Sequence, residues 1–261
     1  MPDIREPAVA GSFYPADPEA LRAEVHGLLA TAAIDARAPK AIIAPHAGYI
    51  YSGPVAASVY ARLAAARGRI RRVVLLGPSH RVGFHGLALP GASLFRTPLG
   101  DIPVDTAAVQ ALRAFPQVHE LDAAHRLEHS LEVQLPFLQE VLGEFTLVPL
   151  VVGDADADAV AEVLETLWGG PETLVVVSSD LSHYQPYATA RRRDAVTSRA
   201  IESLDPDALH HEDACGRNPI RGLLALARRH GYTIETVDLR NSGDTAGPRD
   251  RVVGYGAYVL H

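Results

Sequence analysis

The chain has 261 residues, 48% of them hydrophobic, and a formal net charge of −7. That is enough for one large core, and the acidic balance argues against a general nucleic-acid binder, which usually presents a basic face. Cys215 is the only cysteine, so no intramolecular disulfide can form. No signal-peptide pattern and no apolar stretch of about 18 residues is present, so we expect a cytoplasmic protein without membrane or nucleic-acid partners.

Helical and strand patterns alternate along the chain. Helices are expected over 18–30, from 52 onward, and over 107–115, 128–141, 156–168, 186–203 and 219–230. Strands are expected over 41–45, 72–77, 145–152, 173–178, 233–238 and 251–260. Asp17 and Pro18 mark the first helix start, Pro136 predicts a kink or split, and the Gly- and Pro-rich stretch 85–103 predicts a hairpin excursion. The alternation predicts an α/β fold, with a mostly parallel or mixed central sheet flanked by helices, in one domain spanning 1–261.

Two histidines follow apolar runs typical of buried parallel strands. His46 comes just after 41–44, and His80 just after 73–76. In open α/β sheets, ligands bind outside the carboxyl ends of the strands. The histidines lie 34 residues apart (80 − 46), about one strand–helix–strand unit, so their strands are expected to be neighbours. The two rings could then converge on one metal ion, the alternative being that each ring is hydrogen-bonded within its own loop.

Two further motifs carry groups suited to proton transfer. Asp180 and His183 follow the strand that starts at residue 173, and an Asp near a His can orient it as a general acid/base. The alternative is a helix-capping cluster with an incidental histidine. In the second motif, Glu128 suits a helix N-terminus, and His129 either projects into the same cleft or is a buried core residue.

Several other residues are weaker candidates. Asp244 is either a third metal ligand or a turn residue, and the turn is favoured when Ser-Gly-Asp is considered alone. Arg217, ahead of a helix N-terminus, could hold an anionic group, and Cys215 beside it could be only a small buried hydrophobe. No phosphate-binding glycine motif, G-x-S-x-G or H-E-x-x-H occurs, which weakens nucleotide, serine-hydrolase and zincin interpretations.

Taken together, these motifs resemble those of the Memo family, which is similar in fold to class III extradiol dioxygenases. The matching segments are Arg5-x-Pro7-Ala8-Val9-Ala10-Gly11, Pro45-His46-Ala47-Gly48-Tyr49, Gly77-Pro78-Ser79-His80, Glu128-His129-Ser130-Leu131-Glu132, Ser178-Ser179-Asp180-Leu181-Ser182-His183 and Cys215-Gly216-Arg217. The resemblance runs nearly end to end. It implies that His46 and His80 are metal ligands and that His183 is an acid/base group beside the metal.

The third ligand is where the chain departs from the pattern that the resemblance implies. In animal Memo, metal binding is assigned to two histidines and a cysteine close to the C-terminus, and this chain has no cysteine there. Asp244 is the nearest candidate. Two imidazoles with a carboxylate form the facial triad of Fe(II) oxygenases, whereas a thiolate favours copper or zinc. Asp244 as a ligand therefore makes Fe(II) the expected cofactor, with copper or zinc as alternatives.

The resemblance implies a dioxygenase-like, metal-dependent oxidoreductase. His183, Asp180 and His129 would be catalytic, and the substrate-binding candidates are Tyr51, Ser79, Arg217 and Cys215. One alternative is a non-enzymatic module that uses the same cleft for signalling or for binding phosphotyrosine peptides, and another is a zinc-dependent hydrolase. The substrate, small molecule or peptide, stays open. The resemblance also implies a pathway link to a radical-SAM protein and to a protein of the AMME-syndrome candidate family.

Overall fold

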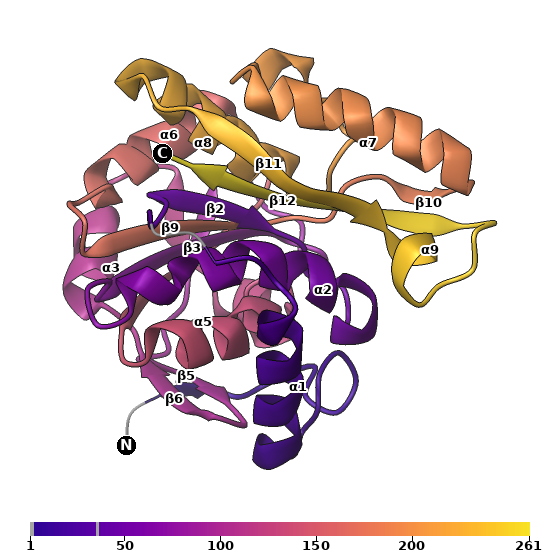
Figure 1. Cartoon of the computed structure of the whole chain (residues 1–261). Helices are drawn as coiled ribbons and strands as arrows, with labels where there is room; N and C mark the ends of the chain where they lie inside the picture. The colour runs from indigo at the N-terminus through magenta and orange to yellow at the C-terminus, as the bar shows by residue number, and fades with distance from the viewer. Residues whose placement is uncertain (1–2, 35–36) are drawn as a thin grey trace.

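A mixed β-sheet forms the centre of the computed structural model, which describes residues 3–34 and 37–261 (Figure 1). Its strand order is β10-β12-β2-β9-β3-β8-β4-β7, and β11 pairs with β12 beside this path. The strands are β2 (Ala41–Ala44), β3 (Arg72–Pro78), β4 (Leu87–Leu89), β7 (Val118–Glu120), β8 (Thr146–Val152), β9 (Thr173–Ser178), β10 (His183–Gln185), β11 (Ile234–Asn241) and β12 (Val252–Leu260). A smaller sheet is made of β1 (Ile4–Arg5), β5 (Leu94–Thr97) and β6 (Gly100–Pro103).

The four inner strands β2, β9, β3 and β8 run parallel. They are apolar along almost their whole length because helices cover both faces, so no side of the strand faces water. β12 and β4 flank them in antiparallel orientation. The expected α/β fold with a mixed central sheet is therefore confirmed.

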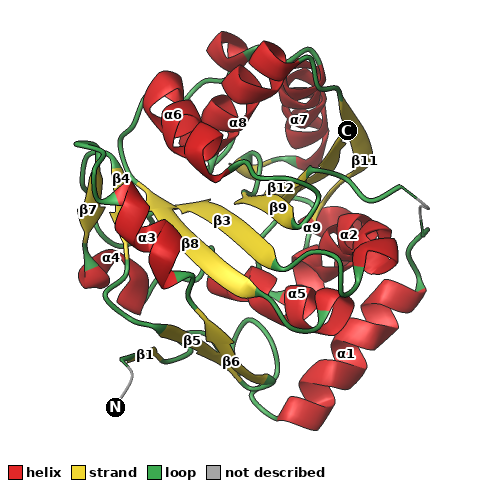
Figure 2. Ribbon diagram, turned by 90° about the vertical axis from the view of Figure 1, so that its left-hand side faces the viewer, coloured by secondary structure: helices red, strands yellow, loops and turns green. Residues whose placement is uncertain are grey.

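Helices pack on both faces of this sheet (Figures 1 and 2). One face carries α1 (Pro18–Ala30), α2 (Tyr49–Tyr60) and α5 (Leu135–Leu142), and the other carries α6 (Ala157–Leu167), α7 (Tyr187–Glu202) and α8 (Arg217–His230). Shorter helices are α3 (Thr106–Leu112), α4 (Asp122–Arg126) and α9 (Ser242–Thr245), with 3₁₀ segments at Ala61–Ala66, Glu132–Gln134 and Pro206–Ala208. Asp17 caps α1 by accepting the Ala20 N–H, and Gly231 ends α8 with φ of 70°, as the sequence predicts.

Three expected elements differ in detail. The helix after His46 begins at Tyr49, because the loop before it is fixed by a hydrogen bond from Tyr49 N to Phe13 O. The expected helix 128–141 is split, and Pro136 stands in the first turn of α5, where its missing N–H costs nothing. Within 85–103 only β5 and β6 form a hairpin, while β4 joins the main sheet.

The two histidine-bearing strands are not neighbours, contrary to the sequence-based expectation. β9 lies between β2 and β3 and pairs in parallel with both. Since adjacent strands are about 4.8 Å apart, the ends of β2 and β3 are separated by about 10 Å. Histidine side chains must therefore reach over the end of β9 to meet, which makes Ser178 at that end part of the site.

A buried carboxylate ties the N-terminal arm to this framework. Glu132 forms an ion pair with Arg5, and both side chains are almost completely buried. The same carboxylate accepts hydrogen bonds from the Val9 N–H at 3.0 Å and from the Tyr14 hydroxyl at 2.5 Å. With so many donors its charge is compensated, and residues 5–14 are held against the segment that follows His129.

Among the described residues, no helix combines the length and the apolar character needed to cross a membrane.

Replacing Glu132 should be strongly destabilising. We predict that Glu132→Ala lowers the free energy of unfolding by about 3–5 kcal/mol, because it leaves the Arg5 guanidinium buried and unpaired. Urea denaturation measures this. Glu212→Ala, which removes the mostly exposed partner of Arg193, is the matched control and should cost less than about 1 kcal/mol. Equal losses in the two variants would contradict this role of Glu132.

Candidate metal centre

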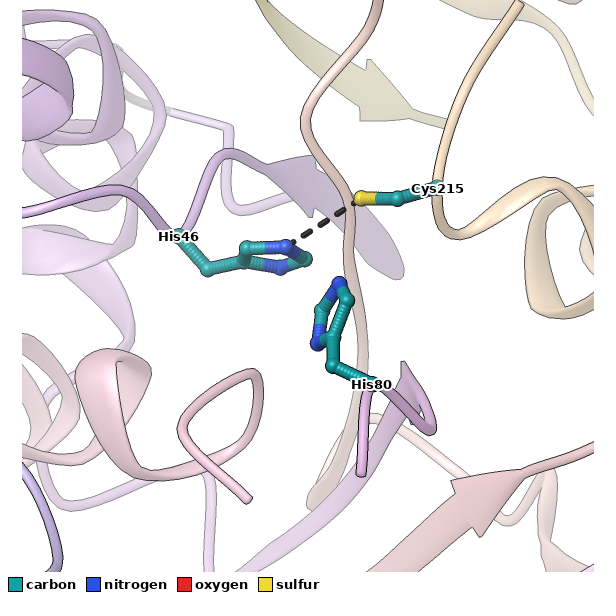
Figure 3. Close-up of side chains that lie close together, drawn as sticks. All are labelled: His46, His80 and Cys215. Atoms are coloured by element: carbon teal, nitrogen blue, oxygen red, sulfur yellow. Dashed lines mark hydrogen bonds between the residues drawn. The ribbon is translucent and has the colours of Figure 1, made fainter. Parts of the chain in front are cut away.

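His46, His80 and Cys215 converge at the carboxyl edge of the inner strands (Figure 3). The two imidazole rings lie 5.2 Å apart between centroids, and Cys215 Sγ lies 3.2 Å from His46 Nε2. One ligand atom from each residue can be chosen so that all three lie within 4.8 Å of one another. The structure thus brings the two rings together, as their positions at strand ends predict, and adds a thiol to the pair.

His46 is buried and held from two sides. Its Nδ1 lies 2.8 Å from Ser178 Oγ at the end of β9, and its backbone N–H donates to the Asp180 carboxylate at 2.8 Å. Burial, with the nearby His80 ring, lowers the pKa of His46 well below its usual range. The ring is therefore neutral at physiological pH, which is the form that binds metal ions.

His80 is oriented by Glu128. The carboxylate accepts from His80 Nδ1 at 2.8 Å and from the His80 backbone N–H at 2.6 Å. Burial alone would raise the pKa of Glu128, but the hydrogen bonds from His80 lower it to about 2, so the group is ionised. An ionised carboxylate only accepts, so Nδ1 of His80 carries a proton, and in the neutral ring the lone pair is on Nε2. Such carboxylate–histidine pairs orient the ring in many metal sites.

A second group of metal-ligand types is formed by His80, Glu128 and His129. These three residues suit a metal ion less well than His46, His80 and Cys215 do. Glu128 already accepts the two hydrogen bonds from His80 and further ones from the backbone N–H groups of His129 and Ser130, each at 3.0 Å. A metal ion there would displace the proton on His80 Nδ1 and most of these donors. We therefore assign Glu128 to holding His80.

Cys215 reaches the histidines from the turn before α8. Gly216 makes this possible, because a Cβ there would come within 2.6 Å of Ser179 Cβ. The thiol sulfur accepts the Asp180 backbone N–H at 3.3 Å. Burial, with the Asp180 charge nearby, raises the pKa of the Cys215 thiol far above its usual range, so it is protonated in the metal-free protein. Its one proton has two acceptors within reach, His46 Nε2 at 3.2 Å and the Asp180 carbonyl oxygen at 3.6 Å.

Asp244, the third ligand expected from the sequence, is not brought to the histidines. It lies in the first turn of α9, where one carboxylate oxygen accepts the Asn241 N–H at 3.1 Å and the other accepts the Tyr187 hydroxyl at 2.5 Å. The Asn241 side chain caps the same helix reciprocally. The sequence-based alternative for Asp244 was a turn residue, and the structure places it in the capping box of the short helix α9. Among the described residues the third donor beside His46 and His80 is Cys215.

A pocket of about 650 Å³ opens above the two histidines. Of the sequence-based candidates, Tyr51, His129, Asp180 and His183 line it. His129 stacks on His80, with 4.6 Å between ring centroids, and burial lowers the pKa of His129 to about 4. The predicted cleft position of His129 is thus observed, and its ring is neutral at physiological pH.

Asp180 and His183 share the pocket but do not form the expected orienting pair. No hydrogen bond joins the two side chains within the described structure, because the Asp180 carboxylate is directed to the His46 backbone N–H. Burial raises the pKa of Asp180. His183 lies on β10, opposite Val253 of β12.

Ser79 and Arg217 lie in a separate cavity of about 520 Å³ that Cys215 also lines. The Ser79 hydroxyl donates to Val82 O at 2.6 Å, and Arg217 Nε donates to the Asn218 side chain at 3.2 Å. Neither residue lines the pocket above the histidines, so their predicted role in binding a substrate there has no geometric support.

Comparisons with known proteins place nearly the whole chain in one family. A model of the Memo-like protein family matches residues 5–259. The chain is 37% identical to a MEMO1 family protein of Aeropyrum pernix, over 97% of this chain and 98% of that protein. It is 36% identical to a MEMO1 family protein of Aquifex aeolicus, over 97% of each. The chain belongs to the Memo-like protein family.

A solved structure supports the fold of this family member. The crystal structure of an uncharacterized protein from Escherichia coli K12 superposes with a TM-score of 0.54 and covers 85% of this chain and 100% of that one. Sequence identity is only 14%, so the likeness concerns the fold alone.

Sequence reasoning missed several pocket residues of this Memo-like chain. Tyr184 and Arg251 line the mouth of the pocket, and the guanidinium lies over the Tyr184 ring at 5.1 Å from its centroid. Tyr184 has a φ of 58°, a left-handed conformation that is uncommon for a bulky residue and is often found at functional sites. No sequence motif marked either residue. Sequence reasoning also passed over Gln134, which lies outside this pocket and is fully buried in the 3₁₀ segment before α5; its signal was a polar residue between the apolar residues Val133 and Leu135.

Metal binding should release a proton from Cys215. We predict that zinc binding at neutral pH releases about one proton per ion, because the thiol is protonated until the ion binds. Apparent affinity should therefore rise about tenfold per pH unit between roughly pH 7 and pH 9. Isothermal titration in two buffers of different ionisation enthalpy counts the protons. Affinity that is independent of pH over this range, without proton release, would contradict thiolate ligation.

Proposed function

We propose that this chain is a metal-dependent oxidoreductase whose ion is bound by His46, His80 and Cys215. The observation that carries the proposal is the pairing of two imidazoles, each hydrogen-bonded through Nδ1 to a buried side chain, with a thiol 3.2 Å from His46 Nε2. Such an arrangement leaves the Nε2 atoms for an ion. The pocket above it leaves room for a substrate at an open coordination position.

The residues present fit a tetrahedral ion. Bonds of about 2.0 Å to nitrogen and 2.3 Å to sulfur place neighbouring ligand atoms roughly 3.3–3.8 Å apart. The distance of 3.2 Å from Cys215 Sγ to His46 Nε2 is close to this, and the upper limit of 4.8 Å for the group requires only a small inward movement. The protonated thiol would lose its proton on binding.

The donor set bears on which ion is bound. The sequence-based preference for Fe(II) depended on Asp244, which lies elsewhere. A thiolate with two imidazoles favours copper or zinc over iron. Copper is the redox-active member of this pair, so the oxidoreductase proposal implies copper. A zinc-dependent hydrolase is the corresponding alternative.

The groups around the ion suit proton transfer. When bound, a redox-active ion would supply electron-transfer chemistry next to the pocket. His129 is neutral at physiological pH and can accept a proton from a substrate hydroxyl at its ring. Asp180, whose pKa is raised by burial, can hold a proton nearer to neutrality than an exposed carboxyl can. His183, on the same wall, can exchange a proton with a substrate in the pocket.

A second candidate function is the binding of an anionic ligand without catalysis. Arg81 and Arg251 line the pocket, and neither guanidinium forms an ion pair in the part of the chain that the structure describes. Guanidinium groups without a carboxylate partner can bind carboxylates and phosphates of a ligand. Titration of metal-free protein with an acidic phosphotyrosine peptide tests this function separately. Tight binding that is lost in Arg251→Ala and unaffected by metal would favour it over catalysis.

Metal analysis of variants tests the proposed ligand set. We predict that His46→Ala, His80→Ala and Cys215→Ser each lose most of the bound metal, measured by mass spectrometry of anaerobically purified protein. Asp244→Asn is the control and should keep the wild-type stoichiometry, because its carboxylate caps α9. Retention of metal in Cys215→Ser together with its loss in Asp244→Asn would overturn the proposed ligand set. Stoichiometric zinc with hydrolysis that needs no O₂ would favour the hydrolase.

A further inference from the structure

A chain of four buried polar side chains leads from α2 to His46. The Tyr60 hydroxyl donates to Gln134 Oε1 at 2.7 Å. Gln134 Nε2 donates to Ser178 Oγ at 2.8 Å, and Ser178 Oγ lies 2.8 Å from His46 Nδ1. Gln134, Ser178 and Tyr60 are all fully buried. Metal binding by His46, His80 and Cys215 does not by itself require this series of hydrogen bonds. The buried hydrogen bonds therefore need a separate physical explanation.

The direction of each hydrogen bond in the chain is fixed by its neighbours. Gln134 Nε2 also donates to Pro45 O at 2.9 Å. Turning the amide round would place its oxygen against this carbonyl oxygen, and neither can donate. The amide nitrogen of Gln134 therefore faces Ser178, and its oxygen faces Tyr60.

Ser178 has one proton and three polar neighbours. Its hydroxyl donates to the Ser130 carbonyl oxygen at 2.6 Å, which can only accept. Gln134 supplies a second bond, in which Ser178 Oγ accepts. The remaining lone pair faces His46 Nδ1, so that nitrogen must be the donor. The opposite arrangement would leave the buried Ser130 carbonyl oxygen without its partner and against an unprotonated oxygen.

We infer that Ser178 is a positioning residue that fixes His46 as the Nδ1–H tautomer, and that Gln134 and Tyr60 hold Ser178 in place. The consequence is that the lone pair of the His46 ring is on Nε2, which faces Cys215. Glu128 has the same effect on His80 through a different acceptor. Both rings then present Nε2 lone pairs to one point before any ion arrives.

The same hydrogen bonds connect the ends of three strands. Gln134 binds Pro45 O beyond β2, and Ser178 ends β9. Ser130, the acceptor of the Ser178 proton, donates through its own hydroxyl to Pro78 O at the end of β3 at 2.9 Å. The chain therefore also holds the strand ends from which His46 and His80 extend, so that the distance between the two rings is set by buried hydrogen bonds.

The inference about the His46 tautomer concerns the metal-free protein. Its consequence for metal affinity rests on the proposed metal binding. The tautomer and the metal affinity are therefore tested by separate measurements. The first is a two-bond ¹H–¹⁵N correlation spectrum of metal-free protein labelled with [¹⁵N]histidine, with His46 assigned from the His46→Gln spectrum. We expect His46 to show a protonated Nδ1 and an unprotonated Nε2. A protonated Nε2 would overturn the inference, whether or not the protein binds metal.

The second measurement is zinc affinity, determined by competition with a chromophoric chelator. We expect Ser178→Ala to weaken zinc binding about 10–100-fold, as loss of such a partner typically does, and to mix the His46 tautomers. Ser178→Thr, which keeps the hydroxyl, should retain the Nδ1–H tautomer. Ser198→Ala is the matched control, because it removes a buried hydroxyl on α7 that is hydrogen-bonded to Thr236, and its zinc affinity should be unchanged.

The outcomes separate this inference from the proposed function. Unchanged tautomer and unchanged zinc affinity in Ser178→Ala would overturn the positioning role while leaving metal binding intact. A wild-type protein with the expected tautomer but no zinc binding would support the inference and contradict the proposed metal site. If Ser178→Ala does not fold, the wild-type spectrum still decides the tautomer.

Discussion

The candidate metal site depends on segment 128–134, whose buried polar side chains must all keep their hydrogen-bond partners. Glu128 holds His80, Ser130 and Gln134 bind Ser178 beside His46, and Glu132 holds the N-terminal arm. Leaving any buried member of this set without a partner costs about 1–3 kcal/mol, and more for a charged group. The packing of this segment against the strand ends is therefore also what orients the two histidines.

The arrangement explains how strands separated by β9 can form one centre. His46 and His80 follow the strands on either side of β9, and Cys215 approaches from the turn before α8, a helix on the opposite face of the sheet from α2. A thiol in this place, rather than a carboxylate, shifts the preferred ion from iron toward copper or zinc. The chemistry of the site therefore follows from which loop supplies its third donor.

The sequence predicted those features of the fold and of the site that depend on local residue patterns. Apolar runs located the inner strands, Asp17 and Gly231 located helix ends, and two histidines at strand ends predicted where the site lies. Strand order was not predictable in this way, because the insertion of β9 between β2 and β3 is decided by packing of segments far apart in the sequence. Asp244 was preferred to Cys215 because the resemblance implied a third ligand close to the C-terminus. That Cys215 reaches the histidines depends on how the turn before α8 packs against the strand ends, and the role of Ser178 depends on the position of β9, so neither could be read from the sequence.

X-ray absorption spectroscopy at the zinc edge tests the central claim most directly, since zinc reports the donor set without changing oxidation state. The account predicts a first shell of two imidazole nitrogens at about 2.0 Å and one sulfur at about 2.3 Å in the zinc-loaded wild-type protein. A wild-type shell made only of nitrogen and oxygen donors would contradict it.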